Sequence, residues 1–406
     1  MVSEKYVRGG ATALLLVMMV VFASCAGDSP LPGVSYSVQN PSVKAVSTTF
    51  DTGEVDGTQG VGLFSSIAID PDDGNPAIAY YWGGSSTTAL RYAKWDGSEW
   101  DVTTVDSTDN VGMHASLAFR NTGCPSIAYY NADDDSLMWA YDEDDDGEWD
   151  DNEDWPHEID SDVGEWGNGE RNCSHDISGS EFGFAYYDEN DGDLICISIL
   201  GNLATNWNVE VDTSDDVGKY CSLHMAGSNT TVSYYDSDNG YLKFAKKNTP
   251  YWDVEQVDDG QGDDIGMYSS LSYKSSSVPT IAYYNNTDHK PWLVTWNTST
   301  SEWDPTCLYD AGLYDYGKWM SHDWDPITGT KAGFSFYDFT SKVLKFILYD
   351  GENYTEYTPD SIPGYYTGQY TSFAWEDDDI GWISHYCVDA ATGRDQSLRC
   401  VEVDDS

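Results

Sequence analysis

One acidic loop of the chain has the residue types and the spacing of a calcium-binding loop. Residues 142–153 read DEDDDGEWDDNE, which matches the pattern D-x-D-x-D-G-x5-E at every position, although no helix pattern flanks it. Calcium needs six to eight oxygen ligands, and alternate acids around a tight glycine turn supply them. We therefore predict a structural Ca²⁺ site, and the alternative is an acidic loop that matches by chance. The predicted ligands are Asp142, Asp144, Asp146, Glu148 through its carbonyl, Asp150 and Glu153.

A second set of candidate residues precedes a recurring serine by two positions. We call it the aromatic set, and it consists of Phe64, His114, Asn172, Tyr220, Tyr268, Trp319 and Tyr370. If the segments that carry these residues form a ring, the set surrounds one mouth of a central channel. Aromatic side chains at that place would stack on sugar rings or on the side chains of a peptide. The alternative is that they pack between neighbouring segments.

The tripeptide Ser-His-Asp occurs twice, at residues 174–176 and 321–323. We do not expect a catalytic triad there, because consecutive side chains of a strand point to opposite faces and triads assemble from separate segments. Asp176 and Asp323 would instead face each other across the channel, together with His224. We predict that these three residues form a polar cluster that holds water. The alternatives are a metal site and an active site.

All these residues belong to a repeat of about fifty residues. The phrase PAIAYY at residues 76–81 recurs as PSIAYY at 125–130 and in altered form five more times, at spacings of 49, 57, 48, 49, 53 and 49 residues. Each copy contains four short β-like segments separated by turn signals. Seven such copies predict an all-β fold, a seven-bladed β-propeller of four-stranded antiparallel blades. The blade repeats start near residues 61, 111, 169, 217, 265, 316 and 367.

The two ends of the repeat region predict how the ring closes. The seventh copy stops after its third strand, and residues 47–51 (STTFD) mirror residues 102–106 (VTTVD) of a fourth strand. We therefore expect an N-terminal strand to complete the last blade and cover its edge. Every fourth segment also ends near an aspartate, which favours turn-forming aspartates over a cation-attracting rim. These aspartates are Asp51, Asp106, Asp160, Asp212, Asp258, Asp310 and Asp360.

The N-terminus has the pattern of an export signal. Lys5 and Arg8 precede an apolar run that ends at Phe22, which is shorter than the about 20 residues of a membrane span. The sequence FASC at its end resembles a lipobox and predicts lipid attachment at Cys25, with simple cleavage as the alternative. We expect a signal peptide at 1–25, a flexible tether at 26–43 and the propeller at 44–406. The protein would then be exported, and either anchored to the cell surface by lipid or secreted.

Composition limits the possible partners. The chain has 70 Asp+Glu against 19 Lys+Arg, a formal net charge of −51, while 40% apolar residues suffice for a large core. The negative field repels nucleic acid and anionic membranes, which leaves a lipid anchor as the predicted membrane contact. We expect a monomer with a glycan or protein ligand. Of the seven cysteines beyond Cys25, Cys387 and Cys400 flank one hairpin and are the best candidates for a disulfide.

The phrases PxIAYY and LRYAKWDGSEW resemble the tandem repeats of secreted bacterial and archaeal propellers. Fucose-specific lectins and sialidase-like propellers are the nearest functionally named relatives in shape, and the resemblance covers residues 44 onward. It implies the propeller fold. The chain contains no complete Ser-x-Asp-x-Gly-x-Thr-Trp box and no three arginines in matching positions, so we expect a non-catalytic binding module. A glycoside hydrolase or lyase that uses channel carboxylates, and a purely structural surface protein, are the alternatives.

Overall fold

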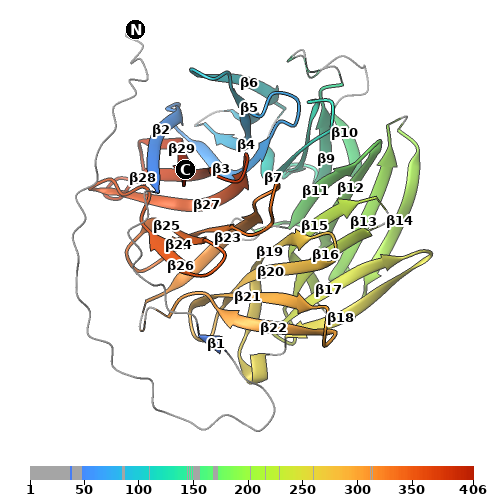
Figure 1. Ribbon diagram of the computed structural model, residues 1–406. Coiled ribbons are helices and arrows are strands. Elements are labelled where there is room, and N and C mark those ends of the chain that lie inside the picture. Colours follow the sequence, from blue (N-terminus) through green and yellow to red (C-terminus); the bar gives the residue numbers. More distant parts are fainter. Residues whose placement is uncertain are drawn as a thin grey trace.

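The computed structural model shows seven antiparallel sheets arranged as blades around a central axis (Figure 1), which confirms the predicted seven-bladed propeller. It describes residues 37–38 and 48–406, apart from 85–86, 109, 144, 146, 148, 150–155, 168–171, 202, 215, 228, 259, 311 and 313. The one helical element of these residues is the short 3-10 turn η1 (Gly260–Gly262). No helix of the described residues is long and apolar enough to cross a membrane.

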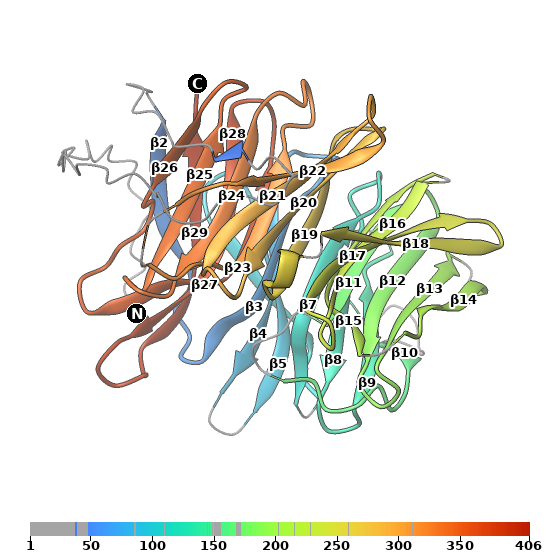
Figure 2. The same ribbon diagram turned by 90° about the horizontal axis from the view of Figure 1, so that it is seen from below.

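Each blade has four strands, and the first strand of each blade lies nearest the axis (Figure 2). The inner strands are β3 (Val61–Ile69), β7 (Val111–Phe119), β11 (Cys173–Ser178), β15 (Val217–Ala226), β19 (Ile265–Ser275), β23 (Tyr316–Trp324) and β27 (Tyr365–Trp375). The second strands are β4 (Pro76–Gly83), β8 (Pro125–Asn131), β12 (Glu181–Asp188), β16 (Asn229–Asp236), β20 (Val278–Asn285), β24 (Ala332–Asp338) and β28 (Ile380–Asp389).

The outer half of each blade is formed by the third and fourth strands. The third strands are β5 (Thr88–Trp95), β9 (Ser136–Tyr141), β13 (Asp193–Leu200), β17 (Tyr241–Asn248), β21 (Lys290–Asn297), β25 (Val343–Tyr349) and β29 (Gln396–Asp404). The fourth strands are β6 (Trp100–Asp106), β10 (His157–Asp160), β14 (Thr205–Asp212), β18 (Tyr251–Asp258), β22 (Glu302–Cys307), β26 (Tyr354–Tyr357) and β2 (Thr49–Asp56). A short segment, β1 (Ser37–Val38), pairs in parallel with β22.

Burial explains the sequence pattern of the strands. The second strands are covered on both faces by neighbouring blades, so β8 is buried along its whole length and reads as a nearly continuous apolar run. The fourth strands face solvent, and β6 accordingly consists of exposed and half-buried residues up to its buried last residue, Asp106. The core therefore consists of separate clusters between adjacent blades. One cluster joins Trp139 of blade 2 to Phe182 and Phe184 of blade 3.

The N-terminal strand completes the last blade, as predicted, but its register differs from the prediction. β2 runs antiparallel to β29 with Thr49 opposite Asp404 and Asp56 opposite Leu398. In blade 1 Asp106 lies opposite Leu90 in the same way, so Asp56 and not Asp51 is the equivalent aspartate. Both strands have the same register shift just before this aspartate, between Glu54 and Asp56 in β2 and between Thr104 and Asp106 in β6, which supports the equivalence.

A ring of serine hydroxyls connects the inner strands. The second edge of an inner strand has no sheet partner, so its backbone N–H groups need other acceptors. In every blade the recurring serine, which we call the repeat serine, accepts a hydrogen bond of 2.9–3.2 Å from a backbone N–H of the next blade. The pairs are Ser66 with Leu117, Ser116 with His175, Ser174 with Leu223, Ser222 with Leu271, Ser270 with His322, Ser321 with Phe373 and Ser372 with Ile67.

The aspartates at the ends of the fourth strands also tie the blades together. At the end of blade 3, Asp212 accepts from the backbone N–H of Ser214 at 3.1 Å through one oxygen, which is the turn-forming role predicted from the sequence. Its other oxygen accepts from the Tyr234 hydroxyl at 2.6 Å and from the Lys243 ammonium at 2.6 Å. Equivalent hydroxyl contacts join Tyr80 to Asp56, Tyr129 to Asp106, Tyr186 to Asp160 and Tyr283 to Asp258.

The predicted disulfide between Cys387 and Cys400 is wrong. Cys387 lies opposite Ser397 in the hairpin of β28 and β29, and Cys400 is three residues further along β29. Side chains alternate between the faces of a strand, so the two sulfur atoms lie on opposite faces of the sheet. All seven cysteines of the described residues are buried free thiols.

Candidate ligand pocket in the channel

The aromatic set lies at the end of the channel where the inner strands begin. Six of its seven members, all except Asn172, have a left-handed backbone with φ between 51° and 54°. Each of these residues lies in a register shift of its inner strand, for example between Leu63 and Ser66 in β3. Such bulges redirect a side chain, and here they turn the ring of each residue toward its neighbours.

The members of the aromatic set contact one another around the channel. Ring centroids are 4.6 Å apart between Phe64 and His114, 4.8 Å between Phe64 and Tyr370, and 5.0 Å between Tyr370 and Trp319. The chain of contacts continues through Tyr268. A cavity of only about 30 Å³ remains between them, which is room for one or two water molecules. The contacts match the packing alternative, and ligand binding by this set stays a prediction.

The opposite end of the channel contains a cavity of about 720 Å³, which we call the channel pocket. Its wall includes all three members of the predicted polar cluster, Asp176, His224 and Asp323. These residues occupy equivalent positions, two residues after the repeat serine of their blades. The structure therefore brings the predicted cluster together in one hollow.

The position two residues after the repeat serine divides the channel into a polar and an apolar side. Blades 3 to 6 carry Asp176, His224, Ser272 and Asp323 at this position, and all four line the channel pocket. Blades 7, 1 and 2 carry Ala374, Ala68 and Ala118. The sequence analysis missed Ser272 and the alanines, although comparing this position among the seven copies would have revealed the pattern.

Asp323 is held where blades 5, 6 and 7 meet. One carboxylate oxygen accepts from the Ser272 hydroxyl and from the Trp324 backbone N–H, both at 2.9 Å. The other accepts from the backbone N–H of Trp375 at 3.4 Å, and the Trp375 indole donates to the Asp323 carbonyl at 3.1 Å. All of these donors are neutral. Burial raises the pKa of Asp323 to about 6, and the hydrogen bonds only partly oppose it.

Asp176 forms the second acidic part of the wall. It accepts from the Met225 backbone N–H at 2.6 Å, and the His224 Nδ1 lies 3.7 Å from the same oxygen. Burial raises the pKa of Asp176, while the His224 side chain and the backbone N–H donors act in the opposite direction. The His224 ring also stacks on Tyr273 with centroids 4.4 Å apart. His224 and Asp176 are each about 30% exposed, so solutes reach them from the pocket.

The Ser-His-Asp tripeptides do not form triads, as expected from strand geometry. The Ser174 hydroxyl accepts from the Leu223 backbone, whereas His175 contacts the Ser126 hydroxyl and the Gly183 carbonyl, both at 2.8 Å. Burial lowers the pKa of His175 to about 4 and that of His322 to about 3. Both imidazoles are therefore neutral at pH 7 and add no positive charge to the pocket.

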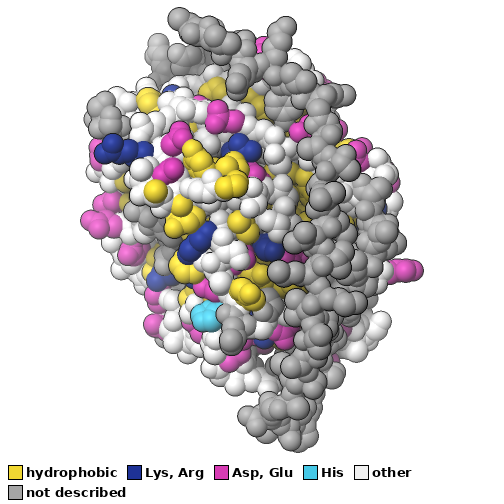
Figure 3. All heavy atoms as spheres, turned by 90° about the vertical axis from the view of Figure 1, so that its left-hand side faces the viewer, with side chains coloured by type: hydrophobic (Ala, Val, Ile, Leu, Met, Phe, Trp, Pro, Cys, Tyr) yellow, Lys and Arg dark blue, Asp and Glu magenta, His cyan; other side chains and the backbone are white. Residues whose placement is uncertain are grey.

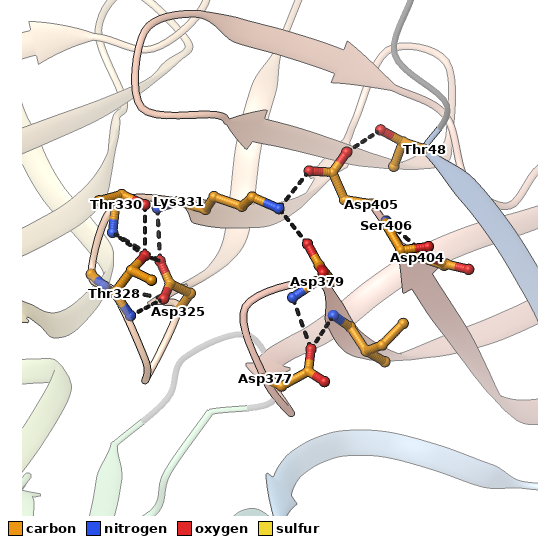
Figure 4. Close-up of polar contacts among 12 residues, drawn as sticks. Thr48, Asp325, Thr328, Thr330, Lys331, Asp377, Asp379, Asp404, Asp405 and Ser406 are labelled. Carbon is orange, nitrogen blue, oxygen red and sulfur yellow. Dashed lines mark hydrogen bonds and ion pairs between the residues drawn. The ribbon is translucent and has the colours of Figure 1, made fainter.

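A rigid loop between β23 and β24 forms another part of the pocket wall (Figure 4). The Asp325 carboxylate accepts from the backbone N–H groups of Thr328, Gly329, Thr330 and Lys331 at 2.5–3.1 Å. Burial acts to raise the pKa of Asp325, but these backbone donors lower it overall. The Lys331 ammonium then reaches Asp379 at 2.7 Å and Asp405 at 3.0 Å, which ties the loop to blade 7.

The calcium loop is described only in part. Asp142 is buried and accepts from the Gly147 backbone N–H at 3.0 Å, while Asp145 lies 3.4 Å from the Lys94 ammonium. The other predicted ligands, Asp144, Asp146, Glu148, Asp150 and Glu153, lie outside the described residues, as does Cys25. Within the part of the chain that the structure describes, no three acids, histidines or cysteines form a group that could hold a metal ion. Calcium binding stays a prediction.

Comparisons with known proteins show the fold class. No family model and no curated protein matches the chain. Among solved structures, the GH74 xyloglucanase from Xanthomonas campestris aligns with a TM-score of 0.53 at 10% identity, over 84% of this chain and 54% of that one. This chain thus spans about half the length of the xyloglucanase. At this identity the likeness shows the β-propeller fold alone.

Two further structures align less closely. A protein of unknown function from Dyadobacter fermentans has a TM-score of 0.49 at 10% identity, over 88% of this chain and 98% of that one. The leech intramolecular trans-sialidase has a TM-score of 0.47 at 12% identity, over 86% of this chain and 69% of that one. The class of the protein is a seven-bladed β-propeller with sialidase-like and other propellers among its structural neighbours.

Proposed function

We propose that this propeller is a non-catalytic binding module whose ligand, a glycan, occupies the channel pocket. The observation that carries the proposal is the division of the channel wall, with four polar side chains on blades 3 to 6 facing the alanines of blades 7 and 1. Pockets for small molecules are hollows of about 300–1,000 Å³ with a few polar groups that fix orientation, and the channel pocket falls within this range.

The lining of the pocket suits a sugar. Asp176 and Asp323 accept hydrogen bonds from hydroxyl groups, and the Ser272 hydroxyl donates or accepts. Tyr273, which is half-buried, adds aromatic surface against which the apolar face of a sugar ring packs. The aromatic set leaves a cavity of only about 30 Å³ at the opposite mouth, whereas the channel pocket of about 720 Å³ has room for a sugar.

A second candidate function is glycoside hydrolysis. Two carboxyl groups with raised pKa values, Asp176 and Asp323, line one pocket, and Asp323 with a pKa of about 6 would be the general acid. Asp176 would then be the base or nucleophile. The experiment that tests glycan binding therefore also has to test for cleavage of the glycan by hydrolysis or by a lyase reaction.

A glycan array tests the proposal. The protein and its Asp323→Asn variant are incubated with the array, and Asp72→Asn is the control, because Asp72 is an exposed acid in the loop after β3. We expect one group of glycans to bind the protein and the control, and to bind the Asp323→Asn variant more weakly. Mass spectrometry of the bound glycans then separates the two functions, since shortened products support hydrolysis and intact glycans support binding. If neither the protein nor its variants retain any glycan, the result contradicts both the binding function and the hydrolytic function.

The remaining predictions from the sequence become part of the same proposal. We propose export, lipid attachment at Cys25 and a structural calcium ion in the loop at 142–153, because all three rest on sequence motifs. They place the binding module outside the cell, either on its surface or free.

A further inference from the structure

We infer that the ligand of the channel pocket carries a positively charged amine, so that an amino sugar binds in preference to its N-acetylated form. The inference rests on the proposed function and specifies its ligand. It follows from the charges of the pocket wall, from the donors that those charges already have, and from the aromatic surfaces beside them.

Negative charge in the channel pocket exceeds positive charge. Three carboxyl groups line it, Asp176, Asp323 and Asp325, whereas Lys274 is the one lysine or arginine among the described lining residues. The Lys274 ammonium lies 4.8 Å from the centroid of the Trp324 ring, and so already has an aromatic partner. The buried imidazoles of His175 and His322 are neutral at pH 7 because burial lowers their pKa values.

The three carboxyl groups differ in the hydrogen-bond donors that each receives from the protein. Asp325 receives four backbone N–H groups and serves its own loop. Asp323 receives only neutral donors, and Asp176 receives backbone N–H groups and the more distant His224 ring. A carboxyl group with a raised pKa is one whose charge lacks compensation, and an ammonium group bound beside it supplies that compensation. Asp323 and Asp176 are therefore the acceptors for a ligand cation.

An aromatic surface next to Asp176 favours the same ligand. The half-buried Tyr273 ring lines the pocket and stacks with His224 beside Asp176, whereas Trp375 is buried and only donates hydrogen bonds to Asp323. Cations are attracted to the faces of such rings. The wall of blades 7 and 1 presents Ala374 and Ala68, which leave space for the uncharged part of the sugar. The net charge of −51 draws cations toward the molecule in general.

Titration calorimetry with two matched probes tests the inference. The probes are the tetrasaccharides of glucosamine and of N-acetylglucosamine, which share one scaffold and differ in the charge of the amine. The experiment uses the full chain at about pH 6.5 and about 0.15 M salt, where interactions between exposed charges are screened beyond about 8 Å. We expect about tenfold tighter binding of the glucosamine probe, as one charge-assisted hydrogen bond provides.

Three variants separate the pocket from the general charge of the protein. Asp323→Asn should reduce the preference for the glucosamine probe to less than about threefold, whereas Asp72→Asn, which removes an equal charge from the exposed loop after β3, should leave it unchanged. Ala374→Lys places a positive charge on the apolar wall and should also abolish the preference. Because Ala374→Lys leaves Asp323 unchanged, it still tests the inference if the Asp323→Asn variant fails to fold.

The outcomes are distinguishable. Equal affinity for both probes overturns the inference and leaves the proposed glycan pocket intact. Binding of neither probe, together with an empty glycan array, overturns the proposed function as well. A preference that survives both Asp323→Asn and Ala374→Lys arises from the net surface charge and contradicts a specific role of the pocket.

Discussion

The hydroxyl of Ser372 in blade 7 accepts a hydrogen bond of 3.2 Å from the backbone N–H of Ile67 in blade 1. This contact is the last member of the serine ring and joins blade 7 to blade 1 at the axis, whereas β2 pairs with β29 in the outer half of blade 7. The propeller is thus closed twice, once by serine hydroxyls on the inside and once by the N-terminal strand on the outside. The second closure continues at the surface, where Thr48 donates to Asp405 at 2.8 Å.

Removing one repeat serine should lower stability. Ser222→Ala leaves the Leu271 backbone N–H without its acceptor in a buried place, which costs about 1–3 kcal/mol of unfolding free energy. Urea denaturation of the variant measures the loss, and Ser276→Ala, at an exposed serine, is the control. Equal midpoints for the two variants would show that the serine ring contributes nothing to stability.

The register of β2 predicts that two aspartates of this strand differ in how much stability is lost when each is replaced by alanine. Asp56→Ala removes the partner of the Arg91 guanidinium at 2.7 Å and of the Tyr80 hydroxyl at 2.8 Å, and should cost about 3 kcal/mol. Asp51→Ala changes an exposed residue and should cost less than about 0.5 kcal/mol. Thermal unfolding of both variants measures the difference. The opposite order would restore the register first expected from the sequence.

Asp323 should make stability depend on pH in an unusual direction. Its pKa of about 6 in the folded state lies above the ordinary value near 3.9, so the folded state binds the proton more tightly. The contribution of this group is therefore fully present below about pH 4 and is lost as the pH rises through about 6, by at most 2–3 kcal/mol. The measurable quantity is the difference in unfolding free energy between the protein and Asp323→Asn at about pH 4 and pH 7.

Other carboxyl groups contribute stability with the opposite pH dependence. The effect of Asp323 is therefore measured as the difference in unfolding free energy between the protein and the Asp323→Asn variant. The pKa of Asp212 is lowered, because hydrogen bonds from Lys243 and its neighbours outweigh burial. Such groups lose their stabilisation in acid. If the protein and Asp323→Asn differ equally at both pH values, Asp323 is not protonated more readily in the folded state.

The calcium motif predicts a metal-dependent melting temperature. An ion that binds only the folded form stabilises it by about 2.7 kcal/mol at a hundredfold excess over its dissociation constant. Calcium should raise the melting temperature of the protein more than magnesium does, and a variant with Asp144→Ala and Asp146→Ala should not respond. The same calcium shift in protein and variant would place the ion elsewhere, and no shift in either would mean that the loop binds no calcium.

The lipobox motif predicts membrane association through one residue. In cells that process bacterial lipoproteins, the protein should sediment with membranes, and Cys25→Ser should release it into the soluble fraction. Detergent phase partitioning of both forms is the measurement. Equal solubility of protein and variant would exclude lipid attachment at Cys25.

The sequence alone determined the number of blades and the order of the strands within them. A repeat copies its local contacts along with its residues, so the Tyr-Tyr phrase and the repeat serine predicted strands at matching positions in all seven copies. The repeat also predicted that Asp176, His224 and Asp323 lie close together, because equivalent positions of a closed ring of blades face the same axis. The alternation of side chains between the two faces of a strand also excluded catalytic triads at the two Ser-His-Asp tripeptides from the sequence alone.

The tertiary structure decided what depends on exact register and on contacts across the ring. The register of β2 makes Asp56, and not Asp51, the equivalent of Asp106, and an odd offset places Cys387 and Cys400 on opposite faces. A side-chain period of two makes both outcomes invisible to approximate alignment. Which end of the channel is filled was likewise beyond the sequence, since it depends on how rings from different blades meet: the aromatic set packs against itself, whereas Asp323 and Asp176 border an open hollow.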